Sequence, residues 1–232
     1  MKRLAAVIIM LWCATTLAAQ AETRPVVVEL YTSQGCSSCP PADAFFHNEL
    51  SAREDVIALA LHVDYWDYIG WKDSFANPAY TKRQKAYAVA AGHRSVYTPQ
   101  LIIGGRDHVV GNKPDKVNGL IEAHKRAASP VRMAMRRQGG TVWIEAEATG
   151  AVKNMVVHLV RYKPEQSVDI KRGENAGKTL TYTNIVDGWD VIAEWDGRAP
   201  LKIKAPARGD NPVVALIQET GNGPILAAAR IR

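Results

Sequence analysis

Two cysteines, Cys36 and Cys39, are separated by two serines. A thiol at the start of a helix is stabilised as a thiolate by free backbone N–H groups and by the positive end of the helix dipole. A second thiol one turn away can then resolve a mixed disulfide. A purely structural bridge explains the pair less well, because closing so short a loop removes little entropy from the unfolded chain. The spacing therefore favours thiol–disulfide exchange.

The elements that must position the cysteines follow a strand–helix–strand order. Residues 25–31 and 56–63 are two runs of mostly apolar residues, and residues 40–52 between them have the pattern of a helix that starts with prolines. Continuously apolar strands joined by a helix are typical of a parallel βαβ unit. The C-x-x-C motif then lies in the turn between the first strand and its helix.

The remaining sequence divides near residue 129. Before it, the patterns predict a helix after Asn77-Pro78 that ends at Gly92, strands over residues 100–103 and 108–110, and a helix over 114–127. After it, short runs alternate apolar and polar residues between glycine-containing turns, as in a β-sandwich. The predicted fold class is α/β over residues 22–129, followed by an all-β, sandwich-like domain over residues 130–232.

The chain resembles the thioredoxin superfamily in two motifs, the CSSC sequence on a βα turn and Thr98-Pro99 ahead of a hairpin. The resemblance implies a thioredoxin-like first domain, in which Pro99 is cis and packs against the disulfide while Thr98 offers backbone polar groups to a bound peptide. It also implies a buried acid near the position of Glu29. That carboxyl would take a proton from Cys39, unless its shift by one residue turns it to solvent or to a salt bridge. Two prolines after Cys39 depart from the usual thioredoxin pattern.

Three stretches, GCSSCPPAD, HVDYWDYIGWKD and VYTPQLIIGG, make the chain similar to a family of secreted bacterial proteins of unknown function. The family pairs a thioredoxin-like domain with a β-rich C-terminal domain. Aromatic side chains follow the second strand and precede Thr98, and they either form a wall for a substrate or pack the fold. These candidate substrate-binding residues are Tyr65, Trp66, Trp71 and Tyr97.

The first 21 residues have the pattern of a cleavable secretory signal. Lys2 and Arg3 precede an apolar run over residues 4–17, and Ala19-Gln-Ala21 fits a signal-peptidase site. Cleavage after Ala21 predicts a periplasmic or secreted protein, and no later stretch is apolar enough to leave a stable membrane anchor. The net charge of +6 falls to +4 without the signal, and the cations are scattered, so nothing supports nucleic-acid binding.

Three functions remain open. The first is a thiol-disulfide oxidoreductase that acts on a protein or small thiol or disulfide substrate and needs no cofactor. The second is a non-catalytic binding module with a permanently closed disulfide. The third is a copper-handling protein that uses Cys36, Cys39 and His62, a combination of thiolate and imidazole that suits copper. The loop at residues 172–177 either binds a partner, clamps the first domain or is an ordinary turn.

Overall fold

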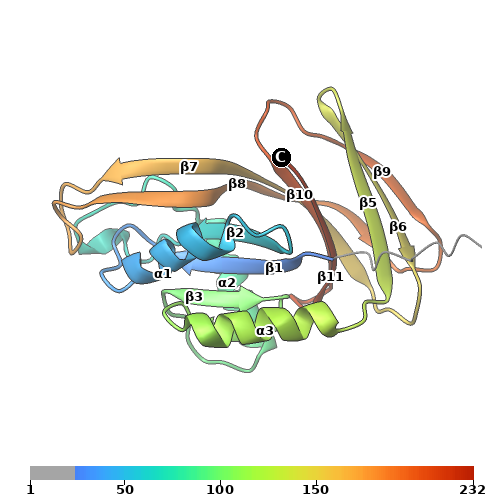
Figure 1. The fold of residues 1–232 in the computed structure, drawn as a ribbon, viewed down its shortest axis with the longest axis horizontal. Helices are drawn as coiled ribbons and strands as arrows, with labels where there is room; N and C mark the ends of the chain where they lie inside the picture. Colours follow the sequence, from blue (N-terminus) through green and yellow to red (C-terminus); the bar gives the residue numbers. More distant parts are fainter. Residues whose placement is uncertain (1–23) are drawn as a thin grey trace, which may run out of the picture.

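A computed structural model describes residues 24–232, and the predicted signal at residues 1–21 lies outside them. Two sheets and a few helices make up this part of the chain (Figure 1). The helical segments are α1 (Pro40–Phe45), its π-helical continuation η1 (Phe46–Leu50), the 3₁₀ turn η2 (Asp67–Ile69), α2 (Pro78–Ala90) and α3 (Pro114–Arg126). The strands are β1 (Val26–Thr32), β2 (Val56–His62), β3 (Gln100–Ile103), β4 (Asp107–Val110), β5 (Val131–Gln138), β6 (Thr141–Ala148), β7 (Met155–Asp169), β8 (Thr179–Trp195), β9 (Leu201–Pro206), β10 (Val213–Glu219) and β11 (Ile225–Ile231).

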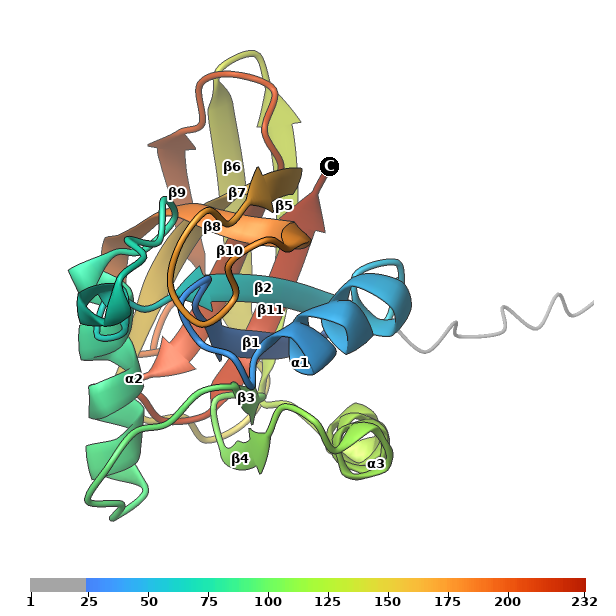
Figure 2. The ribbon, with the colours of Figure 1, turned by 90° about the vertical axis from the view of Figure 1, so that its left-hand side faces the viewer.

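The first half of the chain surrounds β1. This strand pairs in parallel with β2 and antiparallel with β3, and every residue of β1 and β2 is buried. Alternate residues of β1 therefore enter two different cores. One core includes residues of α1, η1 and α3, and the other includes Tyr80 and Tyr87 of α2. Figure 2 shows α2 on one side of β1 and β2 and the other helices across from it.

Local sequence signals explain the ends of these elements. Pro78 begins α2, and the side chain of Asn77 accepts a hydrogen bond from the backbone N–H of Ala79 at 2.9 Å. Gly104 and Gly105 have φ angles of 59° and 69° in the turn between β3 and β4, a conformation that favours glycine. The helices and the strand pair predicted up to residue 127 are confirmed, with the first helix ending at Leu50.

The second half of the chain consists of strands, as predicted, but it does not form a clearly separate domain. Strand β8 lies beside β2, and one eight-stranded sheet runs in the order β11-β10-β7-β8-β2-β1-β3-β4. The smaller sheet, β5-β6-β9, packs through shared apolar clusters against β7, β10 and β11. The alternating pattern predicted strands correctly, but a pattern within one strand does not specify which strand lies beside it.

Strands β7 and β8 form a long antiparallel hairpin that continues past its pairing with β10. In Figure 1 the tip of this hairpin lies at the same end of the molecule as the start of α1. The hairpin therefore brings residues near position 175 to the cysteine motif. Among residues 24–232, no helix is long and apolar enough to cross a membrane.

Candidate functional site

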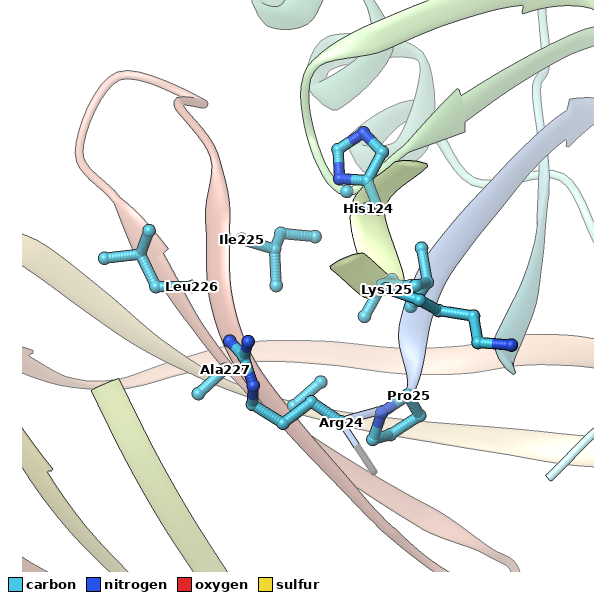
Figure 3. Close-up of a pocket in the computed structure, with 11 residues that line it drawn as sticks. Arg24, Pro25, His124, Lys125, Ile225, Leu226 and Ala227 are labelled. Carbon is cyan, nitrogen blue, oxygen red and sulfur yellow. The ribbon is translucent and has the colours of Figure 1, made fainter. Parts of the chain in front are cut away.

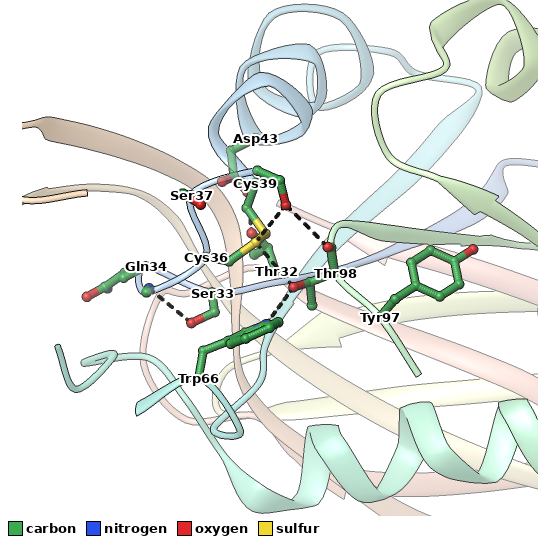
Figure 4. The surroundings of a disulfide bond; sticks show 12 residues. Thr32, Ser33, Gln34, Cys36, Ser37, Cys39, Asp43, Trp66, Tyr97 and Thr98 are labelled. Carbon is green, nitrogen blue, oxygen red and sulfur yellow. Dashed lines mark hydrogen bonds between the residues drawn. A yellow bond between two sulfur atoms is a disulfide. The ribbon is translucent and has the colours of Figure 1, made fainter. Parts of the chain in front are cut away.

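Cys36 and Cys39 form a disulfide in the turn between β1 and α1, with Cα atoms 5.4 Å apart (Figure 4). Cys39 is the N-cap residue of α1, and its carbonyl oxygen accepts hydrogen bonds from the N–H groups of Ala42 and Asp43. Cys39 is fully buried, and Cys36 is 4% exposed. Because both residues after Cys39 are prolines, the first turn of the helix lacks two backbone donors. Stabilisation of a Cys36 thiolate must therefore come largely from other groups.

Hydroxyl groups stand beside Cys36. The Thr98 hydroxyl donates a hydrogen bond to Cys36 Sγ at 3.2 Å, and the Ser38 hydroxyl oxygen lies 3.4 Å from the same sulfur. Trp66 Nε1 in turn donates to Thr98 Oγ1 at 2.7 Å and holds that hydroxyl in place. The Thr98-Pro99 peptide bond is cis. The predicted proximity of this segment to the disulfide is thus confirmed, and a threonine side chain makes the contact.

The four predicted aromatic residues have different surroundings. Trp66 contacts Thr98, and Tyr97 is partly exposed beside it in the chain. Tyr65 instead donates its hydroxyl hydrogen to Gln84 Oε1 at 3.2 Å and packs against the α2-side core. Trp71 Nε1 donates to Gln34 Oε1 at 2.8 Å. Tyr65 and Trp71 thus have packing roles. Trp66 contacts Thr98 beside the disulfide, whereas the Tyr97 ring points away from it (Figure 4).

Tyr68 was not predicted. It is 80% exposed and stacks against Trp66 with ring centroids 6.4 Å apart.

Glu29 lies on the face of β1 that α2 covers, across the sheet from α1. Its carboxylate accepts two hydrogen bonds from Arg83, at 2.8 and 2.9 Å, and others from the hydroxyls of Tyr31 and Tyr87. Burial raises the pKa of Glu29, but the Arg83 guanidinium and the three side-chain donors hold it below its usual value. The one-residue shift therefore gives the salt bridge that the sequence left as an alternative, and the interpretation of Glu29 as the proton acceptor for Cys39 is wrong.

Asp43 is a buried carboxyl on the side of the disulfide, one helical turn after Cys39. Its Oδ1 accepts a hydrogen bond from the Thr32 hydroxyl at 2.8 Å, while Oδ2 has no hydrogen-bond partner among the described residues. Burial raises the pKa of Asp43 to about 7. Asp43 was not among the residues predicted for the site. Its spacing of four residues from Cys39 is the signal that would have found it.

A second buried polar group lies near Asp43. His62 Nδ1 is 2.7 Å from Asp73 Oδ2, and the His62 and Tyr182 rings are 4.8 Å apart. Within residues 24–232, His62 Nε2 and the Tyr182 hydroxyl also have no hydrogen-bond partner. Burial raises the pKa of Asp73, but His62 and two backbone N–H groups hold it below its usual value. An unpaired set of polar atoms from α1, β2 and β8 thus lies behind the disulfide.

The loop at residues 172–177 also reaches the disulfide, where Asn175 Nδ2 donates to the carbonyl oxygen of Cys36 at 2.9 Å. Of the alternatives left open for this loop, the contact agrees with a clamp on the first half better than with an ordinary turn. Asn175 was not singled out in the sequence, since its role depends on pairing across more than a hundred residues.

With the disulfide, the cis-proline segment and the β-rich second half in place, the comparisons with known proteins are informative. A family model described as protein of unknown function (DUF1223) matches residues 27–218. The chain belongs to the DUF1223 family. The crystal structure of a protein from Agrobacterium tumefaciens is similar to it, with 34% sequence identity, a TM-score of 0.77, and coverage of 89% of this chain and 93% of that one. No curated protein matches the sequence.

In this DUF1223 protein the copper alternative lacks a suitable set of donors. His62 is fully buried and faces Asp73, Phe75 and Tyr182. No group of three or more His, Cys, Asp or Glu side chains in residues 24–232 is placed to hold a metal ion.

A cavity of about 60 Å³ lies between the start of β1, α3 and β11 (Figure 3). Its lining includes Arg24, Pro25, His124 and Lys125. The disulfide follows the other end of β1, so this cavity is separate from the candidate site.

Proposed function

We propose that the protein exchanges thiols and disulfides through Cys36 and Cys39. The observation that carries the proposal is the asymmetry of the pair. Cys36 Sγ accepts a hydrogen bond from the Thr98 hydroxyl, while Cys39 is fully buried. A hydroxyl donor favours a thiolate over a thiol, and only a thiolate attacks a disulfide. The arrangement of strand, C-x-x-C turn, helix and adjacent cis-proline resembles that of thioredoxin-like proteins.

In the reducing direction, the Cys36 thiolate attacks one sulfur of a substrate disulfide. The S–S bond of the substrate breaks, a mixed disulfide forms, and the first substrate thiolate leaves. The Cys39 thiolate then attacks Cys36 Sγ, so that the Cys36–Cys39 disulfide forms and the second substrate thiolate leaves. Two electrons pass from the dithiol to the substrate, and the reverse sequence oxidises a substrate dithiol.

Cys39 must lose a proton before this second step, and Asp43 is the acceptor that the geometry supports. Cys39 is inaccessible to solvent, and Asp43 follows it by one helical turn with Oδ2 unpaired. A carboxyl whose pKa is about 7 can take up and release a proton near neutral pH. His62 and Tyr182, with unpaired polar atoms of their own, extend this buried region away from the disulfide.

The substrate side of the proposal rests on the surface around Thr98. Trp66 donates to the threonine that contacts Cys36 Sγ and stacks with the exposed Tyr68, and such rings bind apolar or extended peptide segments. We propose a protein or small-molecule disulfide or thiol as the substrate. The predicted secretory signal would place this chemistry in the periplasm or outside the cell, where disulfides persist.

One observation favours the alternative of a binding module with a closed disulfide. Only 4% of the Cys36 surface is exposed, because Thr98, Ser38 and the hairpin loop surround it. Exchange requires one of these segments to move. In the binding module, none would move and the disulfide would stay intact under mild reduction.

Trapping separates the two functions. Cys39→Ser leaves Cys36 as the attacking thiol without its resolving partner, so incubation with oxidised glutathione or a disulfide-bonded protein should yield a stable mixed disulfide at Cys36, identified by mass. Cys36→Ser is the matched control and should trap far less, because Cys39 is buried. For the wild type, a reduction potential above about −300 mV is expected for an exchange catalyst, because catalytic couples reach down to about −270 mV. No adduct with Cys39→Ser, together with a potential below about −300 mV, would favour the closed structural disulfide.

A further inference from the structure

The loop between β7 and β8 is built into the disulfide site. Asn175, near its tip, is fully buried. Its side-chain amide donates two hydrogen bonds, to the carbonyl oxygen of Gln34 at 3.0 Å and to that of Cys36 at 2.9 Å. Asn175 Oδ1 accepts from Lys178 Nζ at 2.9 Å, so all the main hydrogen-bonding capacity of the side chain is used. One side chain thus connects the second half of the protein to both sides of Gly35.

The neighbouring residue brings a charge to the motif itself. Glu174 Oε2 accepts a hydrogen bond from the backbone N–H of Ser37 at 3.3 Å. Ser37 lies between the two cysteines. Without Glu174, its backbone N–H would be free to donate a hydrogen bond to a Cys36 thiolate. Because a carboxylate occupies this donor and adds a negative charge, Glu174 disfavours a thiolate at Cys36.

The loop also fits closely against Gly70 and Trp71 in the segment that follows η2. Gly173 has a φ angle of 79°, and a Cβ atom there would lie 3.1 Å from Trp71 Cβ. The Cα of Gly173 in turn lies in contact range of Gly70, where a Cβ atom would be 3.7 Å from it. At the base of the loop, the N–H of Ile170 donates to Lys178 and the N–H of Gly177 donates to Ile170. The loop is therefore held at its base, at Gly173 and at its tip.

We propose that this loop, residues 171–178, is a tuning element of the disulfide site, in which Asn175 positions the Cys36 segment and Glu174 opposes negative charge on Cys36 Sγ. The proposal rests on the proposed function for its biological meaning, but not for its chemistry, since it concerns the reactivity of one thiol. Asn175 is a positioning residue because its contacts with the cysteine motif are hydrogen bonds to the backbone carbonyls of Gln34 and Cys36. Glu174 acts on Cys36 through charge and through the Ser37 N–H.

The two roles are linked in a way that can be measured. Asn175 holds the tip of the loop against the Gln34–Cys36 backbone and so keeps Glu174 next to Ser37. Replacing Glu174 by Gln removes the charge and keeps an oxygen that can accept from Ser37, so the effect of Glu174→Gln is electrostatic. That effect should disappear when Asn175→Ala releases the loop. A single exposed carboxylate beside the cysteine motif changes the population of the Cys36 thiolate by about twofold at low salt.

The experiment measures the alkylation of reduced Cys36 by iodoacetamide, an uncharged reagent, between pH 5 and 10 in a Cys39→Ser background. The reaction is followed by mass spectrometry on the peptide that contains Cys36, and no disulfide substrate is present. Glu174→Gln should raise the rate about twofold below the midpoint of the profile and shift that midpoint down. In the Asn175→Ala background, Glu174→Gln should change neither the alkylation rate nor the midpoint of the profile.

Two matched controls lie on the same hairpin. Glu194→Gln removes an exposed carboxylate from the far end of β8 and should leave the profile unchanged. Asn184→Ala removes another buried amide, which donates to the Ala58 carbonyl at 3.0 Å, and should lower stability without moving the profile. Salt dependence is a further test that needs no Asn175 variant. NaCl at 1 M should raise the alkylation rate of Cys36 in the Cys39→Ser protein, but not when Glu174→Gln is also present.

The proposal is overturned if Glu174→Gln reacts at the parent rate, if it adds the same twofold change in the Asn175→Ala background, or if salt acts equally on both proteins. These outcomes are independent of the proposed function, because a loop that tunes Cys36 does so whether or not the protein turns over a disulfide. Conversely, a failure of Cys39→Ser to trap substrate leaves the alkylation result standing.

Discussion

Two buried carboxyl groups lie on opposite faces of the central sheet, and their surroundings differ. Glu29, on the α2 face, accepts hydrogen bonds from Arg83, Tyr31 and Tyr87. Asp43, on the α1 face, accepts one side-chain hydrogen bond, from Thr32, and its second oxygen has no partner within residues 24–232. Both are buried, so the difference in their chemistry comes from their partners.

The partners decide which charge state each carboxyl holds. A cation and several donors keep Glu29 ionised, and its pKa is lowered in spite of burial. Within residues 24–232 Asp43 forms no ion pair, and burial raises its pKa to about 7 although the nearby His62 opposes this rise. A carboxyl whose oxygens all have hydrogen-bond partners stabilises the fold. A carboxyl with an unpaired oxygen can bind and release a proton near neutral pH. We therefore assign a structural role to Glu29 and a chemical role to Asp43.

Breaking the Glu29 cluster should have the largest effect. Arg83→Met leaves a buried carboxylate without its cation and removes the contact of Arg83 with the Trp189 ring, whose centroid is 3.9 Å away. We expect a loss of about 3 to 5 kcal/mol in the free energy of unfolding at pH 7, measured by urea denaturation. Arg161→Met is the control, since its ion pair with Asp190 is partly exposed and contributes at most about 1 kcal/mol. Equal losses for the two variants would contradict the structural role of Glu29.

The change of the free energy of unfolding with pH in acid tests the same role of Glu29. The pKa of Glu29 is lowered from its model-compound value of 4.5, so its stabilisation is present above pH 4.5 and is lost as the pH falls below that value. Arg83→Met should lose this acid dependence, and its deficit relative to the wild type should shrink below pH 4.5.

Asp43→Asn should act in the opposite direction on stability. The pKa of Asp43 is raised from 3.8 to about 7, so the folded state binds a proton that the unfolded chain has lost between these values. Stability from this group is therefore full below about pH 4 and declines as the pH rises through 7. We expect Asp43→Asn to be more stable than the wild type by roughly 1 to 3 kcal/mol at pH 8, and by much less at pH 4, in urea denaturation of the oxidised proteins.

A matched control exists on α3. Asp115 also lies in the first turn of a helix but is exposed. Asp115→Asn should show no such gain between pH 4 and pH 8. A stability gain for Asp43→Asn that is the same at both pH values would argue against a raised pKa.

The same variant should slow the chemistry. Without a carboxyl to take the proton from Cys39, resolution of the mixed disulfide in Asp43→Asn should fall by at least about tenfold at pH 7. Stopped-flow reaction of the preformed Cys36–glutathione adduct measures this step alone. Alkylation of Cys36 serves as the control and should change little, because Thr98 rather than Asp43 contacts its sulfur. Equal slowing of both reactions would show that the substitution acts on the whole site.

Thr98→Val should have the smallest effect and should act on reactivity only. It removes the hydroxyl that donates to Cys36 Sγ and leaves Trp66 Nε1 without its acceptor. We expect alkylation of reduced Cys36 at neutral pH to slow by about threefold to tenfold, measured from the pH profile of the reaction. Thr98→Ser keeps the hydroxyl and should stay near the wild type. A Thr98→Val profile that overlays the wild type would remove Thr98 from the thiolate argument.

Much of this arrangement was predictable from local patterns. Unbroken apolar runs predicted β1 and β2 as buried strands, and Asn77-Pro78 marked the start of α2. The cysteine spacing and Thr98-Pro99 predicted two segments of the site. These signals work because helix starts, tight turns and strand burial depend on side chains only a few residues apart.

Three features required the tertiary structure. The side of β1 on which Glu29 lies depends on strand facing, and one residue reverses it. Asp43 becomes unusual only because packing buries it without a cation. The position of Asn175 at the cysteine motif depends on β8 lying beside β2, although Asn175 and Cys36 are 139 residues apart.

The sequence by itself therefore determined the elements and the cysteine pair of this protein, because each is set by neighbouring residues, whereas the cis bond at Pro99 was implied only by a resemblance. Only the tertiary structure decided which carboxyl faces the disulfide and which loop from the second half contacts it. The physical reason is that pKa values and hydrogen-bond partners are properties of a buried environment, and distant strands build that environment together.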